Sequence, residues 1–267
     1  MKQHYIPRCY LKRFSDNEKS INTYDKTTSK SYNAPLMSVC CEEDMYTLSD
    51  EYVKRCWEEN HQEINNLTIE KEHFARDVEP NYSRFLSDLD TIQDEWLTGK
   101  DHYRLSFYEK KELAARLTYM NYDELMKCAG AMANNYFVFW VSKGGDFYTS
   151  DFPIAVEPHV PNQGYLYCGL LMYGSEMMMS LSPSLALSIY DRNYHKDKEE
   201  LDGSFIVADD KEIRRHNMMR YFYAQRHVFS YKNDFRLIEF IHRARGGEHI
   251  YMTPHLKAEV VSGLGRY

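Results

Sequence analysis

Apolar side chains between residues 82 and 96 repeat at the spacing of an α-helix. The repeat comprises Tyr82, Phe85, Leu86, Leu89, Ile92 and Trp96. Steps of three and four residues place side chains on one helical face, so this stretch predicts an amphipathic helix. Pro80 and Asn81 precede the repeat and Gly99 follows it, which are ordinary start and stop signals. Weaker repeats on both sides extend the predicted helical segment to about residues 51–135.

The rest of the chain, about residues 136–267, has the short aromatic and β-branched runs that are typical of strands. Strands are predicted at residues 136–142, 147–149, 166–173, 176–181, 185–190 and 227–231. Residues 143–146 read Lys-Gly-Gly-Asp, which predicts a hairpin turn. A helix is predicted at residues 209–223, and residues 235–242 are compatible with a second one.

The N-terminal fifty residues show no helical repeat. Residues 2–14 are predicted to be extended, which would put His4 and Arg8 on one face of a strand. A short strand is predicted at residues 21–24 and a loop at residues 29–36.

These patterns predict an α+β fold in which the helical middle segment packs against an antiparallel sheet. The N-terminal strand is expected to complete that sheet. Because no linker rich in Pro, Gly or Ser separates the stretches, a single domain over residues 1–267 is expected. The alternative is two lobes with a ligand cleft between them.

Charge and cysteine content restrict the class of protein. The chain has 40 acidic and 33 basic residues, a net charge of −7, whereas proteins that coat duplex DNA are strongly basic. No apolar run reaches the roughly 18 residues that a membrane span needs.

The six cysteines form no CxxC pair, which argues against a zinc ribbon or finger. The N-terminus lacks signal-peptide features, so reduced cysteines and a cytoplasmic location are expected.

Two pairs of polar residues in the first half of the chain are suited to chemistry. His4 offers an imidazole that can act as acid, base or metal ligand, and Arg8 offers a guanidinium that can grip phosphate. The structural alternative is that both residues hold the N-terminal segment in the core.

Glu59 and Glu63 lie four residues apart on a predicted helix, where two like charges favour a cation or an arginine between them. Their alternative is a solvated acidic face.

A third motif follows a predicted strand in the second half. Ser150 and Asp151 come directly after that strand and are followed by Pro153. Such positions are common for catalytic or metal-binding aspartates, and equally common for turns in which Asp and Ser bond the local backbone. Asn217 lies on the apolar stripe of the helix at residues 209–223, where a buried amide needs partners. Ser150 and Asn217 are therefore expected to support the site.

These motifs together resemble a known family. The run Gln-His-Tyr-Ile-Pro-Arg-Cys-Tyr-Leu-Lys-Arg-Phe at residues 3–14 resembles the N-terminal signature of a bacterial family named domain of unknown function 4238. Later residues that agree with it, in order, are 43–46, Glu59 and Glu63, 149–153, 181–183 and Asn217. Cys9 replaces an aromatic residue and Ser180 replaces a proline of the family pattern. The resemblance covers nearly the whole chain, and the family name implies no activity.

The leading hypothesis is an enzyme that acts on a phosphate-containing substrate, a nucleic acid or a nucleotide, as a hydrolase or nuclease. Arg8 would hold phosphate, while His4 and Asp151 would be the other catalytic groups. Glu59, Glu63 and Asp151 would bind Mg²⁺ or Mn²⁺, since oxygen ligands suit these hard ions. His4 is expected to lie within about one water-mediated contact of Asp151.

The alternative hypothesis is a non-enzymatic module that binds a protein, a peptide or a small ligand. On this view the polar motifs form a structural network, and part of the 23 tyrosines forms the binding surface. A role in phage defence is compatible with an orphan bacterial family, but no residue indicates it.

Overall fold

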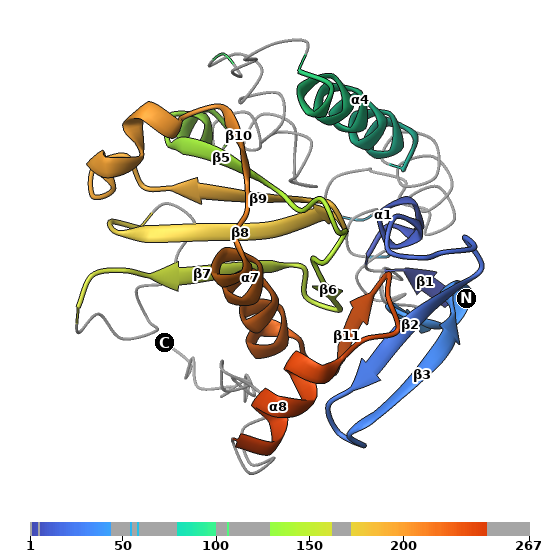
Figure 1. The fold of residues 1–267 in the computed structure, drawn as a ribbon. Helices are drawn as coiled ribbons and strands as arrows, with labels where there is room; N and C mark the ends of the chain where they lie inside the picture. The colour runs from blue at the N-terminus through green and yellow to red at the C-terminus, as the bar shows by residue number, and fades with distance from the viewer. Residues whose placement is uncertain are drawn as a thin grey trace, which may run out of the picture.

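The computed structural model describes residues 2–4, 6–43, 79–99, 129–161 and 172–244, together with Lys54, Glu58 and Ser106. Two β-sheets lie next to each other in this part of the chain, and helices pack on them (Figure 1). Mainly antiparallel sheets with helices packed on them confirm the α+β class. Among the described helices, none combines the length and the apolar character that crossing a membrane requires.

The larger sheet has five strands in the order β10-β5-β9-β8-β7. Its strands are β5 (Tyr136–Val141), β7 (Ile154–Pro158), β8 (Ser175–Ser182), β9 (Leu185–Tyr190) and β10 (Ser204–Val207). Neighbouring strands are antiparallel except for β10 and β5, which are parallel. The strands predicted at 136–142, 176–181 and 185–190 are confirmed, and β7 and β10 are additional.

Four described helices surround the sheets: α1 (Arg8–Lys12), α4 (Glu79–Leu97), α7 (Asp210–Tyr223) and α8 (Arg236–Ala244). The helices predicted around 82–96 and 209–223 are confirmed, and so is the one at 235–242. Gly99 has a φ of +73°, the left-handed conformation that commonly ends a helix.

The five-stranded sheet is buried on both faces. Every residue of β8 and β9 is buried. Along β8, Met177 and Met179 pack in the same cluster as Phe85 of α4, whereas Met178 between them packs with Met219 of α7. Because successive strand residues point to opposite faces, α4 and α7 cover opposite sides of the sheet. The packing of the helical segment on a sheet is thus confirmed for α4.

The smaller sheet has the order β3-β2-β11-β6 and joins distant parts of the chain. Its strands are β2 (Ser20–Asp25), β3 (Lys30–Pro35), β6 (Thr149–Ser150) and β11 (His227–Ser230). β11 lies between β2 and β6: Val228 is the register partner of Tyr24 on one side and of Ser150 on the other. The strands predicted at 21–24 and 227–231 are confirmed.

The N-terminal segment differs from the extended strand predicted over residues 2–14. Only β1 (Lys2–His4) is a strand there, and it pairs with β4 (Cys41–Glu43) in a separate two-stranded sheet. Pro7 has extended backbone angles and precedes α1, a position that suits proline because a helix start has no use for its missing N–H. His4 and Arg8 therefore do not share a strand face, and this strand does not complete either larger sheet.

Two further predictions are wrong. Residues 29–36 contain β3, which pairs with β2 along its whole length, although nearly all of its side chains are exposed. An exposed edge strand shows no apolar alternation, so its sequence looks like a loop. The segment 143–146 does not join paired strands, because β5 pairs with β9 and β10 whereas β6 pairs with β11.

The weaker helical repeats predicted on both sides of α4, within residues 51–135, lie mostly outside the described residues; at their end, residues 129–133 are helical. The strand predicted at 166–173 lies outside the described residues except for its end, where residues 173–174 form a turn. The assignment of residues 1–267 to a single domain stays a prediction.

Candidate functional site

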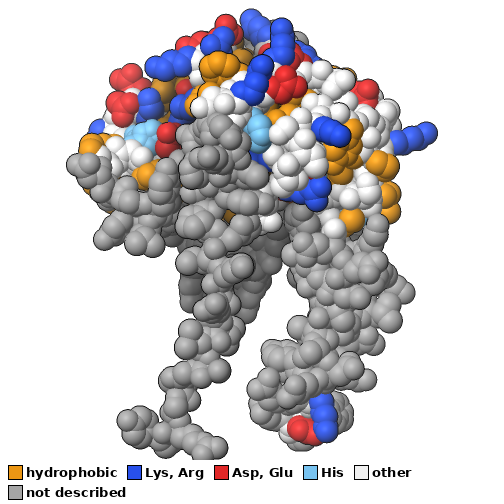
Figure 2. Space-filling view, turned by 90° about the horizontal axis from the view of Figure 1, so that it is seen from below, with side chains coloured by type: hydrophobic (Ala, Val, Ile, Leu, Met, Phe, Trp, Pro, Cys, Tyr) orange, Lys and Arg blue, Asp and Glu red, His pale blue; other side chains and the backbone are white. Residues whose placement is uncertain are grey.

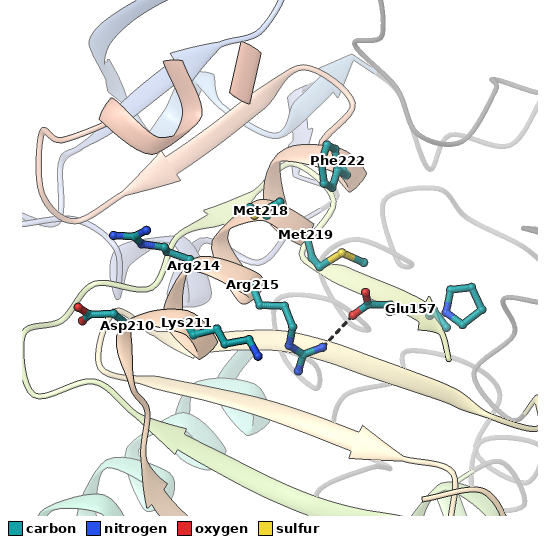
Figure 3. Close-up of a pocket in the computed structure, with 10 residues that line it drawn as sticks. Glu157, Asp210, Lys211, Arg214, Arg215, Met218, Met219 and Phe222 are labelled. Atoms are coloured by element: carbon teal, nitrogen blue, oxygen red, sulfur yellow. Dashed lines mark hydrogen bonds and ion pairs between the residues drawn. The ribbon is translucent and has the colours of Figure 1, made fainter. Parts of the chain in front are cut away.

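A cleft of about 840 Å³ lies between α7 and the end of β7 (Figure 3). Its apolar wall consists of Val156, Pro158, Met218, Met219 and Phe222. Its charged residues are Glu157, Asp210, Lys211, Arg214 and Arg215. A concave, mainly apolar site with a few polar groups at one end is the usual form of a ligand pocket.

The charged end of this cleft is positioned by the start of α7. The carboxylate of Asp209 accepts a hydrogen bond from the backbone N–H of Glu212 at 2.7 Å, which caps the helix. Asp210 and Glu212 in the first turn complement the positive end of the helix dipole. Arg215 follows one turn later and points to the five-stranded sheet.

Arg215 is the centre of a buried ion cluster. Its Nη1 donates to Oε2 of Glu157 at 2.8 Å and to Oε2 of Glu176 at 2.7 Å. Its Nη2 donates to Oε1 of Glu176 at 2.7 Å and to Oε1 of Glu212 at 2.6 Å. One guanidinium thus faces three carboxylates, and the close, forked geometry is the one that arginine forms best.

Glu157 and Glu176 are register partners on neighbouring antiparallel strands, β7 and β8. Like charges directly opposite each other destabilise a sheet, so a cation must lie between them. The side chain of Glu176 is 0% exposed, and that of Glu157 is 34% exposed. Burial raises the pKa of Glu176, but the interactions with His159 and Arg215 outweigh burial and hold this pKa well below its ordinary value. Glu176 is therefore a buried carboxylate at neutral pH.

Three histidines border the cluster. His159 Nε2 lies 3.0 Å from Glu176 Oε2 and 3.8 Å from Glu157 Oε2. His195 is 6% exposed, and its ring packs against the rings of His159 and Tyr190. His216 is fully buried and lies 3.2 Å from Ser188 Oγ. Burial lowers the pKa of both His195 and His216, so both imidazoles are neutral near pH 7.

Two groups of side chains in the described part of the chain could hold a metal ion. They are Glu157 with His159 and Glu176, and Glu176 with Glu212 and His216, and within each group the ligand atoms lie within 4.8 Å of one another. Carboxylate and imidazole donors together suit divalent ions such as Mn²⁺ and Zn²⁺.

Lys211 and Arg214 are the exposed cations of the cleft, and neither has an ion-pair partner among the described residues. In Figure 3, Lys211 and Arg215 extend to the side of Glu157, and Arg214 extends to the other side of α7. Elsewhere the described surface mixes the two signs of charge: on the face shown in Figure 2, acidic and basic side chains alternate over short distances. The described part of this face therefore shows no broad basic field.

Arg8 lines a different, more polar cleft of about 480 Å³ between α1 and α4. Arg8 and Lys12 lie one turn apart on α1, and Ser83 and Ser87 face them from α4. Arg8 Nη1 lies 2.9 Å from the sulfur of Met37. His4 Nε2 lies 3.4 Å from the carbonyl oxygen of Leu36, so both residues contact the segment that follows β3.

Asp151 occupies a structural position at the end of β6. Its carboxylate accepts three backbone hydrogen bonds, from Gln225 at 2.8 Å, Arg226 at 2.7 Å and His227 at 2.8 Å. Burial raises the pKa of Asp151 even though these donors lower it. The partners of His4 and Asp151 belong to different segments, and the contact expected between the two side chains stays a prediction.

Ser150 and Asn217 also bind backbone groups. Ser150 Oγ donates to the carbonyl of Phe152 at 2.7 Å. Asn217 accepts from the N–H of Tyr148 at 2.8 Å and donates to the carbonyl of Asp146 at 2.8 Å, which fixes the segment before β6. Their supporting role agrees with this geometry. Glu59 and Glu63 lie outside the described residues, and their predicted metal-binding role stays a prediction.

The residues of the Arg215 cluster are absent from the sequence-based candidates. A signal for them exists in β8, where Glu176 precedes three methionines in a strand that is otherwise apolar or small. A charged residue inside such a run must be exposed or paired when the strand is buried on both faces. The two-residue spacing of Glu157 and His159 along an extended segment is a second, weaker signal.

Comparison with known proteins gives one match. The family model described as "Protein of unknown function (DUF4238)" matches residues 2–122 and again residues 114–234. No curated protein and no solved structure matches the chain.

Proposed function

Because the chain belongs to the DUF4238 family of proteins of unknown function, we propose its function from the α7–β7 cleft: it is an enzyme that acts on a phosphate-containing substrate, a nucleotide or a nucleic acid. The observation that carries this proposal is a cleft with exposed cations and an apolar wall, next to a carboxylate–histidine cluster of which Glu157 and Arg215 line the cleft. Clefts that hold ionisable groups with shifted pKa values are the usual location of active sites.

The two ends of the cleft suit the two parts of a nucleotide. Lys211, on the side of Glu157, would bind phosphate oxygens by charge-assisted hydrogen bonds, and Arg214, on the other side of α7, would bind a further phosphate of a longer substrate. Met218, Met219 and Phe222 would contact the base or the sugar through their apolar surfaces. A ligand with an anionic group and a flat apolar group would satisfy both ends together.

The cluster beside the cleft supplies groups for acid–base chemistry. Glu157 lines the cleft and is the more exposed of the paired glutamates, so its carboxylate is the candidate base, or the ligand of an ion that activates water. His159, whose side chain is 30% exposed, is the candidate acid when no ion is bound. Arg215 is a positioning residue, because its contacts with Glu157, Glu176 and Glu212 hold the cluster together.

The role proposed for Arg8 from the sequence is kept as a second phosphate-binding position. Its support is the polar cleft between α1 and α4, which Arg8 lines together with Ser83 and Ser87; Lys12 in the same cleft is paired with Glu18. A catalytic role of His4 and Asp151 does not enter this proposal, because the Asp151 carboxylate already accepts three backbone hydrogen bonds.

The alternative is a module that binds the same kind of ligand without acting on it. The observation that favours it is the use of Asp151, Ser150 and Asn217 for backbone contacts. On this view, three of the residues that agree with the family pattern stabilise the fold, and the cleft binds its ligand without catalysing a reaction.

Binding of fluorescent ATP and of short labelled single-stranded DNA and RNA, followed by anisotropy, tests the proposal. We expect Lys211→Ala/Arg214→Ala to weaken binding about tenfold or more, since a hydrogen bond to a charged group contributes about 1.5–3 kcal/mol. The matched control is Lys30→Ala/Lys143→Ala, which removes two exposed cations outside the cleft. Absence of binding to every probe by the folded wild-type protein would overturn the proposal.

Turnover separates the enzyme from the binding module. The same probes are incubated with the protein and divalent ions, and phosphate release or strand cleavage is measured. Glu157→Gln is expected to lose turnover while binding stays within about threefold, because the substitution keeps the size of the side chain. Binding without turnover in the wild-type protein would support the alternative.

A further inference from the structure

Glu157, Glu176 and Arg215 leave a charge imbalance at the edge of the cleft. Three carboxylates, those of Glu157, Glu176 and Glu212, surround the single guanidinium of Arg215. Buried carboxylates are retained when they are paired or when they coordinate a metal. One more cation would therefore stabilise this cluster.

His159 brings an imidazole nitrogen to the same place. Its backbone N–H donates to the carbonyl of Gly174 at 2.8 Å, which anchors the residue just beyond β7. Its Nε2 is buried and lies 3.0 Å from Glu176 Oε2, an ion-pair distance, but it makes no well-aligned hydrogen bond among the described residues.

Three ligand atoms thus converge: one oxygen of Glu157, one of Glu176, and Nε2 of His159, all within 4.8 Å of one another. Ligands about 2.1 Å from a metal ion lie about 3.0–3.4 Å apart in octahedral or tetrahedral geometry. The distances of 3.0 and 3.8 Å between His159 Nε2 and the two glutamate oxygens are close to that range.

His195 provides an independent indication. Its ring is 6% exposed and packs edge-on against the ring of His159, with 4.7 Å between the ring centroids. Its Nε2 also has no hydrogen-bond partner in the described part of the chain. A buried His195 nitrogen without a hydrogen bond, next to a His159 nitrogen whose contact with Glu176 is poorly aligned, is a costly arrangement without a ligand.

We propose that Glu157, His159 and Glu176 form a binding site for a divalent transition-metal ion, of the Mn²⁺ or Zn²⁺ type, at the edge of the α7–β7 cleft. The mixed oxygen and nitrogen donors distinguish this ion from Ca²⁺ and Mg²⁺, which take oxygen ligands. His195 holds the ring of His159 in place. The site differs in every residue from the Glu59, Glu63 and Asp151 set predicted from the sequence.

Arg215 is compatible with the metal ion. A carboxylate oxygen has lone pairs for a hydrogen bond and for a metal bond together. Arg215 Nη1 donates to the same Oε2 atoms of Glu157 and Glu176 that face His159, and Nη2 donates to Glu176 Oε1 and Glu212. Arg215 thus orients both carboxylates as an outer partner, and each shared oxygen would use a second lone pair for the ion. In the second group of possible ligands, His216 Nε2 already contacts Ser188 Oγ and Glu212, so that group is the weaker candidate.

Calorimetric titration of the full-length, EDTA-treated protein with Mn²⁺, Zn²⁺ and Mg²⁺ alone tests the site. No phosphate ligand is present, so the result does not depend on what the cleft binds. The expected result is one Mn²⁺ or Zn²⁺ per chain, with Mg²⁺ at least tenfold weaker. His159→Ala and Glu157→Gln are each expected to weaken the transition-metal binding at least tenfold.

Two matched variants control for charge and for general effects. Asp210→Asn removes one carboxylate from the same cleft outside the proposed ligands, and His242→Ala removes a histidine on α8; both are expected to bind like the wild type. Far-UV circular dichroism confirms that each variant is folded. Wild-type protein without a binding event, or unchanged binding in both His159→Ala and Glu157→Gln, would overturn the inference. A selective loss in Glu212→Gln would assign the ion to the group with His216.

Discussion

Asp151 and His227 hold each other by two hydrogen bonds. The N–H of Asp151 donates to the carbonyl of His227 at 3.0 Å, and the N–H of His227 donates to the carboxylate of Asp151 at 2.8 Å. The same carboxylate accepts from Gln225 and Arg226. This one side chain therefore fixes the turn between α7 and β11, and through it the centre of the smaller sheet.

Asp151→Ala should destabilise the protein strongly. It leaves three part-buried backbone N–H groups without this acceptor, and each such loss costs about 1 kcal/mol, so we expect a loss of about 2–3 kcal/mol. Chemical denaturation measures this loss. Asp16→Asn, in an exposed turn, is the control and should change stability by about 0.5 kcal/mol or less. Unchanged stability with lost turnover on a phosphate substrate would instead assign Asp151 to catalysis.

Arg215→Met should remove the cation that separates two paired glutamates. Removing the guanidinium leaves the fully buried Glu176 without its main cation, while Glu157 is 34% exposed and screened by solvent, so we expect a cost of about 2–3 kcal/mol. Adding Glu157→Gln to this variant should restore about 1 kcal/mol or more, since one of the repelling charges is gone. Urea denaturation of the four proteins of this cycle measures the coupling. The neighbouring Arg214→Met is the control, and an additive cycle would contradict the account of the cluster.

Acid should weaken the cluster. Interactions with Arg215 and its histidine neighbours hold the pKa values of Glu176 and Glu212 below their ordinary values, despite burial. Because these folded-state pKa values are depressed, the stabilisation is fully present above the unfolded value of about 4.3 and is lost as the pH falls below it. Thermal unfolding between about pH 3 and pH 7 should show this loss, and Glu212→Gln should show less of it. Equal acid sensitivity in both proteins would refute the prediction.

Arg220→Met should be tolerated. Arg220 is fully buried, donates from Nη2 to the carbonyl of Met178 at 2.8 Å, and has no partner for Nε and Nη1 among the described residues. Burial lowers the pKa of Arg220 to about 10, so the residue is still charged at neutral pH. Replacing an unpaired buried charge by an apolar side chain of similar length should leave stability unchanged or raise it by about 1–3 kcal/mol. A loss above about 2 kcal/mol would reveal a bound anionic partner.

The parts of the fold that the sequence predicts are those in which one physical signal dominates. α4 and α7 follow from helical spacing, and β8 and β9 follow from short apolar runs that are buried on both faces. β3 could not be predicted, because its exposed side chains carry no apolar pattern and its partner β2 supplies the reason for its conformation. The change from strand to helix at Pro7 could not be predicted either, because it depends on which side chains of residues 2–14 the rest of the fold buries.

The candidate site is less predictable than the fold. Residue type alone could not distinguish an aspartate that binds a substrate from one that binds the backbone, as Asp151 does. The Arg215 cluster joins α7 to two strands, and only the pairing of β7 with β8 brings Glu157 opposite Glu176. That pairing is a property of the tertiary structure, which spacing along the chain does not contain.

The place of β11 between β2 and β6 has a consequence for the order of folding. β2 lies near the start of the chain, whereas its partner β11 lies about two hundred residues downstream. During synthesis, β2 and β3 can pair early, but the other edge of β2 stays unpaired until residues 227–230 have left the ribosome. Nascent chains that stop before residue 227 should therefore be recognised by chaperones or proteases, whereas chains that extend past α8 should become protease-resistant.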